Sequence, residues 1–163
     1  KDSENGKSLI DEAVIAKILG IVILNIKMDN FKWSIDMEHR KYGKIDVKGS
    51  TLQYYHIGYS ESERWEFSIR RKIDCDTNFL LGYDNKRENI LQMLIIPNEY
   101  IFEKENITIV NNAFRTSKYD RFIINDISQY NGAYKNLILY LKDKERFGIE
   151  DIKKWLYMKE KNI

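Results

Sequence analysis

The sequence has one cysteine, one proline and two histidines, and each shortage excludes a class of protein or site. Because Cys75 is the single cysteine, it cannot form a disulfide within the chain or build a cysteine cluster around a metal, which is typical of a reducing, cytoplasmic compartment. His39 and His56 lack the spacing of a histidine metal site. One proline and eight glycines among 163 residues exclude a low-complexity linker.

Neither the net charge nor the length of the hydrophobic runs indicates binding to nucleic acid or to a membrane. The 27 basic and 25 acidic residues give a net charge of +2, which does not indicate nucleic acid by itself but leaves room for a local basic patch. The longest apolar run, "ILGIVILNI" (residues 18–26), is too short to span a bilayer, and no signal peptide is recognisable, so no membrane partner is expected. The chain does not begin with methionine, so we expect it to be processed or excised from a longer protein.

The composition is that of a folded domain, with 43% hydrophobic, 13% aromatic and 32% charged residues. A chain of this length can bury a sizeable core as one unit. Residues 1–163 are therefore expected to form a single domain.

The pattern of apolar residues predicts a helix, then strands, then helices. Ser8 is expected to cap the first helix, with Asp11 completing a capping box and Gly20 ending it. The expected strands are residues 30–36, 44–57, 65–70, 77–84, 90–97 and 106–110, with turns at 37–43, 61–64 and 85–89 and helices at 127–144 and 148–161. Residues 21–28 fit either a longer first helix or a strand. The order predicts an α/β fold, a mixed central β-sheet of four to five strands flanked by helices, mainly helical from about residue 125.

The stretch "YGKIDVKGS" (residues 42–50) contains an unusual polar pattern. In a strand, alternate side chains point to the same face, so Asp46, Lys48 and Ser50 share one face while Val47 and Gly49 share the other. The strands that follow are strongly apolar, which is typical of a buried sheet. Three polar side chains next to such buried strands are unusual and suggest a function.

A second carboxylate indicates which function. Asp36 closes one expected strand, and Asp46 lies ten residues later on the next, so a hairpin would bring the two carboxylates together. Neighbouring carboxylates repel unless a cation holds them, and Mg²⁺ prefers oxygen ligands while keeping several waters. Lys48 could orient a water or stabilise charge on a phosphate. Such a set suits phosphodiester hydrolysis.

Asp36 and the triplet Asp46-Val47-Lys48 resemble the D-x(n)-(D/E)-x-K signature of the PD-(D/E)XK nuclease superfamily, which includes restriction endonucleases and archaeal Holliday-junction resolvases. The resemblance covers residues 8–96 and includes the order of the elements. In many members the first helix carries a metal-binding glutamate, and Glu12 occupies that place. Ile35 stands where the name-giving proline would be.

The resemblance implies a restriction-endonuclease-like fold and hydrolysis of DNA phosphodiester bonds that depends on Mg²⁺, with Mn²⁺ able to substitute. It assigns catalysis to Asp36, Asp46, Lys48 and Glu12, and metal binding to Asp36, Asp46 and Glu12. Restriction-type and junction-resolving enzymes both cut two strands. The resemblance therefore also implies a homodimer.

Phosphate contacts need basic or polar groups on exposed segments. The DNA-contact candidates are His39, Arg40, Lys41, Lys44, Ser50, Arg70, Arg71, Lys86 and Arg87. The alternative for each basic residue is a solvated surface charge, and for Ser50 a structural hydroxyl.

Three other interpretations remain open at this point. Asp46 and Lys48 could form an ordinary surface pair, with Asp36 in a turn and Glu12 solvated. The chain could also be a nucleic-acid-binding module without catalysis, or a domain that binds a protein partner. Cys75 is expected to be a buried packing thiol, with Asp74 and Asp76 beside it capping a turn.

Overall fold

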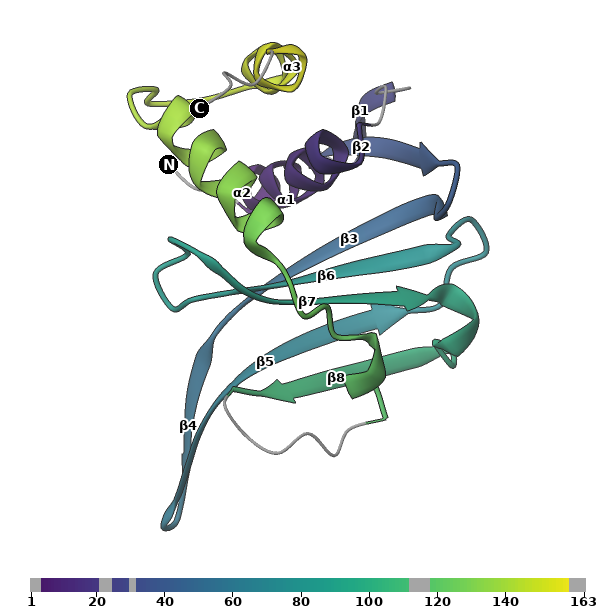
Figure 1. The fold of residues 1–163 in the computed structure, drawn as a ribbon, viewed down its shortest axis with the longest axis vertical. Coiled ribbons are helices and arrows are strands. Elements are labelled where there is room, and N and C mark those ends of the chain that lie inside the picture. The colour runs from purple at the N-terminus through teal and green to yellow at the C-terminus, as the bar shows by residue number, and fades with distance from the viewer. Residues whose placement is uncertain (1–3, 21–24, 30–31, 112–117, 159–163) are drawn as a thin grey trace.

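Helices, a five-stranded sheet and a three-stranded sheet form three layers in the computed structural model, which describes residues 4–20, 25–29, 32–111 and 118–158 (Figure 1). The helices are α1 (Glu4–Leu19), α2 (Ser128–Leu141) and α3 (Ile149–Tyr157), with short 3-10 helices η1 (Asn98–Tyr100) and η2 (Asp120–Phe122). The strands are β1 (Asn25–Asp29), β2 (Lys32–His39), β3 (Gly43–Thr51), β4 (Gln53–Ile57), β5 (Ser60–Arg70), β6 (Thr77–Tyr83), β7 (Ile90–Pro97) and β8 (Lys104–Val110).

The larger sheet is mixed. Its strand order is β1-β2-β3-β6-β7, with β3 and β6 parallel and the other neighbours antiparallel. The smaller sheet, β4-β5-β8, is antiparallel throughout. The expected α/β fold with a mixed central sheet of four to five strands and flanking helices is confirmed.

Two apolar clusters hold the layers together. The first lies between the helices and the larger sheet, and the second lies between the two sheets. Strand β6 is buried on both faces, because Phe79 and Leu81 enter the first cluster while Leu80 enters the second. A strand covered on both sides is a near-continuous apolar run, as "TNFLLGY" is.

The start of helix α1 differs from the expected one. The helix already includes Glu4, so Ser8 and Asp11 lie within it, and the expected capping box is wrong. Asp11 does not cap the helix but is buried, with 4% of its surface exposed. Gly20, with a φ of +65°, follows the last helical residue, which confirms it as the stop signal.

The expected strand over residues 44–57 is two strands in different sheets. Strand β3 ends at Thr51, the amide of Leu52 donates to the carbonyl of Tyr83, and β4 begins at Gln53. Residues 61–64, expected as a turn, lie within β5, and the chain reverses at Gly58, which has a φ of +61°. Both predictions were wrong: neither proline nor glycine marks the junction at Leu52, and the polar residues 61–64 continue a strand.

The expected turn at 37–43 is shorter in the structure, because residues 37–39 continue β2 and Gly43 already begins β3. The remaining elements agree with the sequence, and part of the undecided segment is now assigned. Residues 25–29 form β1, while residues 21–24 and the expected strand start at 30–31 lie outside the described residues. Trp65, Phe67 and Ile69 share one buried face, as predicted. The turn at 85–89 and the two C-terminal helices are confirmed. No helix among the described residues is long and apolar enough to cross a membrane.

Candidate active site

The β2–β3 hairpin brings Asp36 and Asp46 to neighbouring strands. In the antiparallel pairing of the two strands Met37 lies opposite Ile45, and Asp36 precedes Met37 as Asp46 follows Ile45. Met37 and Ile45 are buried in the first cluster. Because side chains alternate along a strand, both aspartates point away from that cluster, toward the face that carries the smaller sheet.

The polar triplet on β3 lies on this same face. Ile45 and Val47 point into the first cluster, whereas Asp46, Lys48 and Ser50 are half-buried on the opposite side. In the parallel ladder, Lys48 stands beside Leu80, and Ser50 stands beside Gly82. The triplet is thus a polar strip along a central strand.

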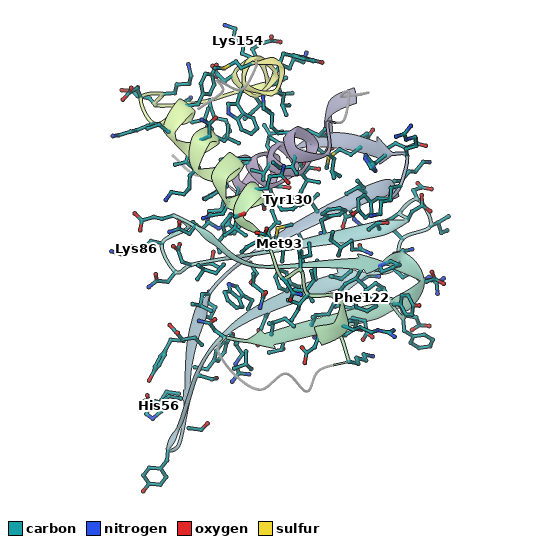
Figure 2. The ribbon with its side chains drawn as sticks, viewed as in Figure 1. His56, Lys86, Met93, Phe122, Tyr130 and Lys154 are labelled. Carbon is teal, nitrogen blue, oxygen red and sulfur yellow. The ribbon has the colours of Figure 1, made fainter. Side chains whose placement is uncertain are left out.

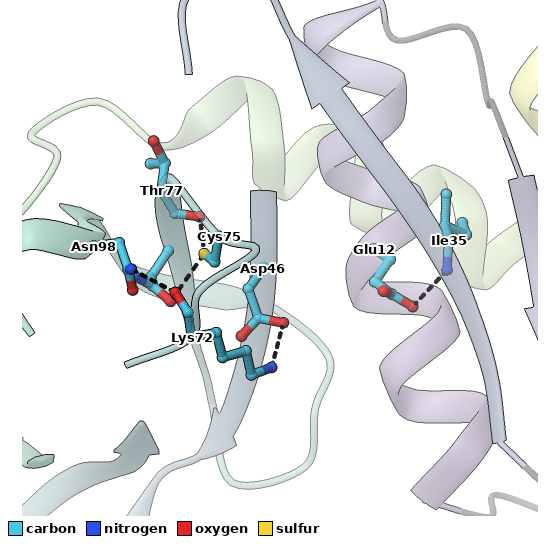
Figure 3. A network of polar contacts seen from close by, with 8 residues as sticks. Glu12, Ile35, Asp46, Lys72, Cys75, Thr77 and Asn98 are labelled. Atoms are coloured by element: carbon cyan, nitrogen blue, oxygen red, sulfur yellow. Dashed lines mark hydrogen bonds and ion pairs between the residues drawn. The ribbon is translucent and has the colours of Figure 1, made fainter. Parts of the chain in front are cut away.

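Helix α1 places Glu12 where β2 and β3 stop pairing. Its Oε1 accepts a hydrogen bond of 3.3 Å from the backbone N–H of Ile35 (Figure 3). The pKa of Glu12 is raised from 4.5 to about 8, mainly by burial; the hydrogen bond from Ile35 lowers it, and the charges of Asp46, Asp11 and Asp36 contribute smaller increases. Asp36 and Asp46 therefore act on Glu12 through their charges, but burial is the larger cause.

This pKa makes stability depend on pH. Between pH 4.5 and about 8 the unfolded chain gives up the Glu12 proton while the folded chain keeps it, so wild-type stability falls as pH rises through this window. Glu12→Gln removes the ionisation and keeps an oxygen for the Ile35 N–H. In the absence of divalent ions, we expect the variant to be more stable than wild type by about a few kcal/mol above pH 8 and equal to it below pH 4.5.

Urea denaturation of both proteins across this pH range measures the effect. A difference between wild type and Glu12→Gln that does not change with pH would contradict the assignment. The exposed Glu38 on β2 supplies the control, since Glu38→Gln should leave the pH profile unchanged.

Asp46 has one oxygen in an ion pair and one without a partner. Its Oδ1 lies 3.2 Å from the ammonium of Lys72, and its Oδ2 is buried without a hydrogen-bond partner among the described residues. Figure 3 shows the side chain of Asp46 directed toward Lys72, and Glu12 toward the backbone of Ile35. A buried carboxylate oxygen without a donor is costly, and a cation or a water would satisfy it.

The loop between β5 and β6 is held against the start of β3. The Oδ2 of Asp76 accepts from the amide of Lys44 at 2.8 Å, and the amide of Asp76 donates to the carbonyl of Lys44 at 2.8 Å. Cys75 is buried, as predicted, and burial together with the charge of Asp46 raises the pKa of its thiol. These backbone and side-chain contacts hold the loop in the position at which Lys72 contacts Asp46.

Several DNA-contact candidates lie at this end of the sheet. The Nδ1 of His39 accepts from the amide of Lys41 at 3.1 Å, and its ring lies against Tyr42. The turn after β2, the start of β3 and the end of β5 with the residue after it carry the exposed side chains of Arg40, Lys41, Lys44, Arg70 and Arg71. Two contacts tie these segments to the site. Lys44 bonds to Asp76 in the β5–β6 loop, and Lys72, which follows Arg71, forms the ion pair with Asp46.

Lys86 and Arg87 lie elsewhere. They follow the C-terminal end of β6, whereas Asp46 pairs with Asn78 near its start, so the two groups lie at opposite ends of the sheet (Figure 2). Lys86 is exposed there. The Arg87 side chain is only 19% exposed and contacts buried groups.

Arg87 belongs to a buried network that the sequence did not reveal. The guanidinium lies 3.6 Å from Oδ1 of Asp11, stacks on the ring of Tyr83 at 4.3 Å and donates to the hydroxyl of Thr51 at 3.0 Å. The hydroxyl of Tyr83 also donates to Asp11. This network fixes α1 against β3 and β6 one residue before Glu12. Its only signal in the sequence is an acidic residue among the apolar residues of the helix.

The network leaves no space for a side chain at position 49. A Cβ on Gly49 would lie 2.4 Å from Oδ2 of Asp11 and 3.2 Å from the Arg87 guanidinium. Asp11 cannot move aside cheaply, because Tyr83 and Arg87 hold it. We expect Gly49→Ala to lower the free energy of unfolding by about 1–3 kcal/mol, measured by urea denaturation.

Gly132 provides the matched control for this measurement. It lies in α2, where no atom lies within 4 Å of an added Cβ. Gly132→Ala should therefore leave stability unchanged or raise it by up to about 1 kcal/mol. Equal effects of the two substitutions would show that the Asp11 network tolerates the methyl group.

The residues fit a magnesium ion in part. No group of three or more His, Cys, Asp or Glu side chains in the described ranges is placed to hold a metal. Magnesium is, however, commonly bound by one or two carboxylates with waters and substrate phosphates completing its shell. Asp36 and Asp46 on adjacent strands, with the unpartnered Oδ2 of Asp46, match that smaller requirement.

No protein-family model matches the sequence. The search of curated proteins also finds no match. Among solved structures, the chain is similar to the bacterial homing endonuclease I-Ssp6803I, with 12% sequence identity and a TM-score of 0.40, over 76% of this chain and 88% of that one. At so low a TM-score and identity, the similarity carries no argument about activity.

Proposed function

We propose that the protein is a metal-dependent endonuclease of the PD-(D/E)XK type that hydrolyses phosphodiester bonds in DNA. One observation carries the proposal: the β2–β3 hairpin places Asp36 and Asp46 on the same face of adjacent strands, and the Oδ2 of Asp46 is buried without a hydrogen-bond partner among the described residues. Neighbouring carboxylates repel each other and a buried oxygen without a donor is costly, and a bound cation would relieve both.

Each residue has a distinct role in this proposal. Asp36 and Asp46 would hold Mg²⁺, and Glu12 would join them or bind one of the waters. A bound Mg²⁺ supplies polarisation of a phosphoryl oxygen and lowers the pKa of a coordinated water. Lys48, on the same strand face as Asp46, orients the attacking water or stabilises the negative charge that grows on the phosphate.

The exposed basic side chains around the site would bind the DNA backbone. The turn after β2, the start of β3 and the end of β5 with the residue after it supply Arg40, Lys41, Lys44, Arg70 and Arg71. Such contacts position a duplex without reading its sequence and make affinity fall with added salt. Because a cut through both strands needs two sites, we propose that the active form is a homodimer.

A plasmid assay tests the activity. Supercoiled DNA should become nicked or linear with Mg²⁺ or Mn²⁺ and remain intact in EDTA. Cleavage that persists unchanged in EDTA would contradict the dependence on metal. Failure to cut any DNA, including four-way junctions, in either metal would contradict the nuclease proposal.

The second candidate is a nucleic-acid-binding module without catalysis. It is favoured by the ion pair between Lys72 and Asp46, which occupies one oxygen of a proposed metal ligand, and by the lack of a three-residue metal group among the described residues. This candidate predicts salt-dependent DNA binding that does not respond to Mg²⁺, with no cleavage. Binding and cleavage measured on the same preparation separate the two functions.

A further inference from the structure

Lys72 is the cation that the fold itself places at the carboxylate group. Its ammonium lies 3.2 Å from Oδ1 of Asp46, and the side chains are 45% and 25% exposed. Lys48, which the sequence marks as the functional lysine, makes no ion pair within the described part of the chain. The positive charge next to Asp46 therefore comes from the β5–β6 loop.

The backbone of this loop is anchored while the Lys72 side chain is accessible. The side-chain amide of Asn98 donates to the carbonyl of Lys72 at 2.8 Å, and the amide of Asn98 donates to the carbonyl of Asp76 at 2.8 Å. Beside it is a shallow depression of about 400 Å³, lined by Arg71, Lys72, Ile73, Asn98 and Glu103. The ammonium can thus leave Asp46 by side-chain rotation, with room beside it and without unfolding the loop.

We propose that Lys72 is an exchangeable counter-ion of Asp46, which a divalent cation displaces when it binds. The proposal rests on the proposed metal site at Asp36 and Asp46. An ammonium 3.2 Å from a carboxylate oxygen and a divalent ion on the same carboxylate would repel each other strongly. The ion binds the carboxylate directly and carries twice the charge, so Lys72 moves toward the depression.

The exchange has a measurable consequence for metal affinity. Every binding event must break the Lys72–Asp46 pair, so the lysine lowers the apparent affinity for the ion. Removing its charge leaves the carboxylates more negative and removes the competitor. Lys72→Met should therefore bind Mg²⁺ or Mn²⁺ more tightly than wild type, by on the order of tenfold. Lys72→Arg keeps the cation and should remain near the wild-type affinity.

Isothermal titration calorimetry with Mg²⁺ and Mn²⁺ alone, without DNA and at fixed ionic strength, measures this directly. Arg71→Met is the matched control, because it removes the same charge from the neighbouring residue, which has no ion pair with Asp46 among the described residues. Its effect on affinity should be much smaller. Circular dichroism checks that each variant is folded.

The outcomes separate this inference from the proposed function. Tighter binding by Lys72→Met but not by Arg71→Met supports the exchange. Measurable binding by wild type with the same affinity in Lys72→Met overturns the exchange and leaves the metal site standing. Equal gains in both variants show a general charge effect and also overturn it. No binding by wild type or by Lys72→Met overturns the metal site itself.

Discussion

Asp46→Ala is expected to lower the rate of DNA cleavage by on the order of 10³-fold or more, since it removes a proposed metal ligand rather than part of the core. The fold should be nearly unchanged. Asp46 is half-buried at the edge of the apolar clusters, and a partly exposed ion pair such as that with Lys72 contributes about 0–1 kcal/mol. Asp36→Ala should have a similar effect on cleavage.

Single-turnover cleavage with Mg²⁺, alongside urea denaturation of each variant, measures the two effects separately. Glu38→Ala is the control, because it removes another carboxylate from β2 at an exposed position. Cleavage by Asp46→Ala at the wild-type rate would remove Asp46 from the site. Asp46→Asn refines the result, since it keeps the shape of the side chain and loses the charge that a metal needs.

Local patterns in the sequence predicted most of the elements. Alternating apolar residues marked β5 through Trp65, Phe67 and Ile69, and the doubly buried β6 was visible as a continuous apolar run. The second sheet was not predicted. Neither proline nor glycine marks the junction at Leu52, and the chain changes sheets there with a contact to β6 that no local pattern reports.

The buried ion pair between Asp11 and Arg87 also could not be predicted from local sequence patterns. Ser8 and Asp11 have the spacing of a capping box, but the partners of Asp11 are Tyr83 and Arg87, far along the chain. Burial and pairing decide the role of an acidic residue, and both come from tertiary structure. For the same reason Arg87, a DNA-contact candidate by sequence, holds α1 in place.

Part of the candidate site could be predicted from the sequence and part could not. The position of Asp36 and Asp46 on adjacent strands follows from the hairpin, which the turn at residues 37–43 predicted. Lys72 was visible only as part of the basic run "RRK" at a strand end. Its contact with Asp46 depends on how Asp76 and Asn98 fold the loop, so the sequence could not assign it.

Lys48→Ala is expected to slow cleavage by on the order of 10²-fold while leaving metal binding intact. An ammonium cannot be a metal ligand, so the carboxylates should bind Mg²⁺ at least as well without it. The variant loses the positive charge that stabilises the phosphate, or the group that orients the attacking water. Both contributions lower the energy of the transition state. The rate constant at saturating DNA should therefore fall, with little change in DNA affinity.

The presence of Lys72 makes this prediction sharper, because two lysines flank the same aspartate from different elements. If Lys48 supplies the catalytic charge, Lys48→Ala should show a large loss in single-turnover rate with an unchanged calorimetric affinity for Mg²⁺. Lys48→Arg should not restore the rate, because its guanidinium is bulkier, planar and always protonated. A Lys48→Ala variant that cleaves at the wild-type rate would instead transfer the role to Lys72, and the alternating triplet on β3 would then be an ordinary polar strip.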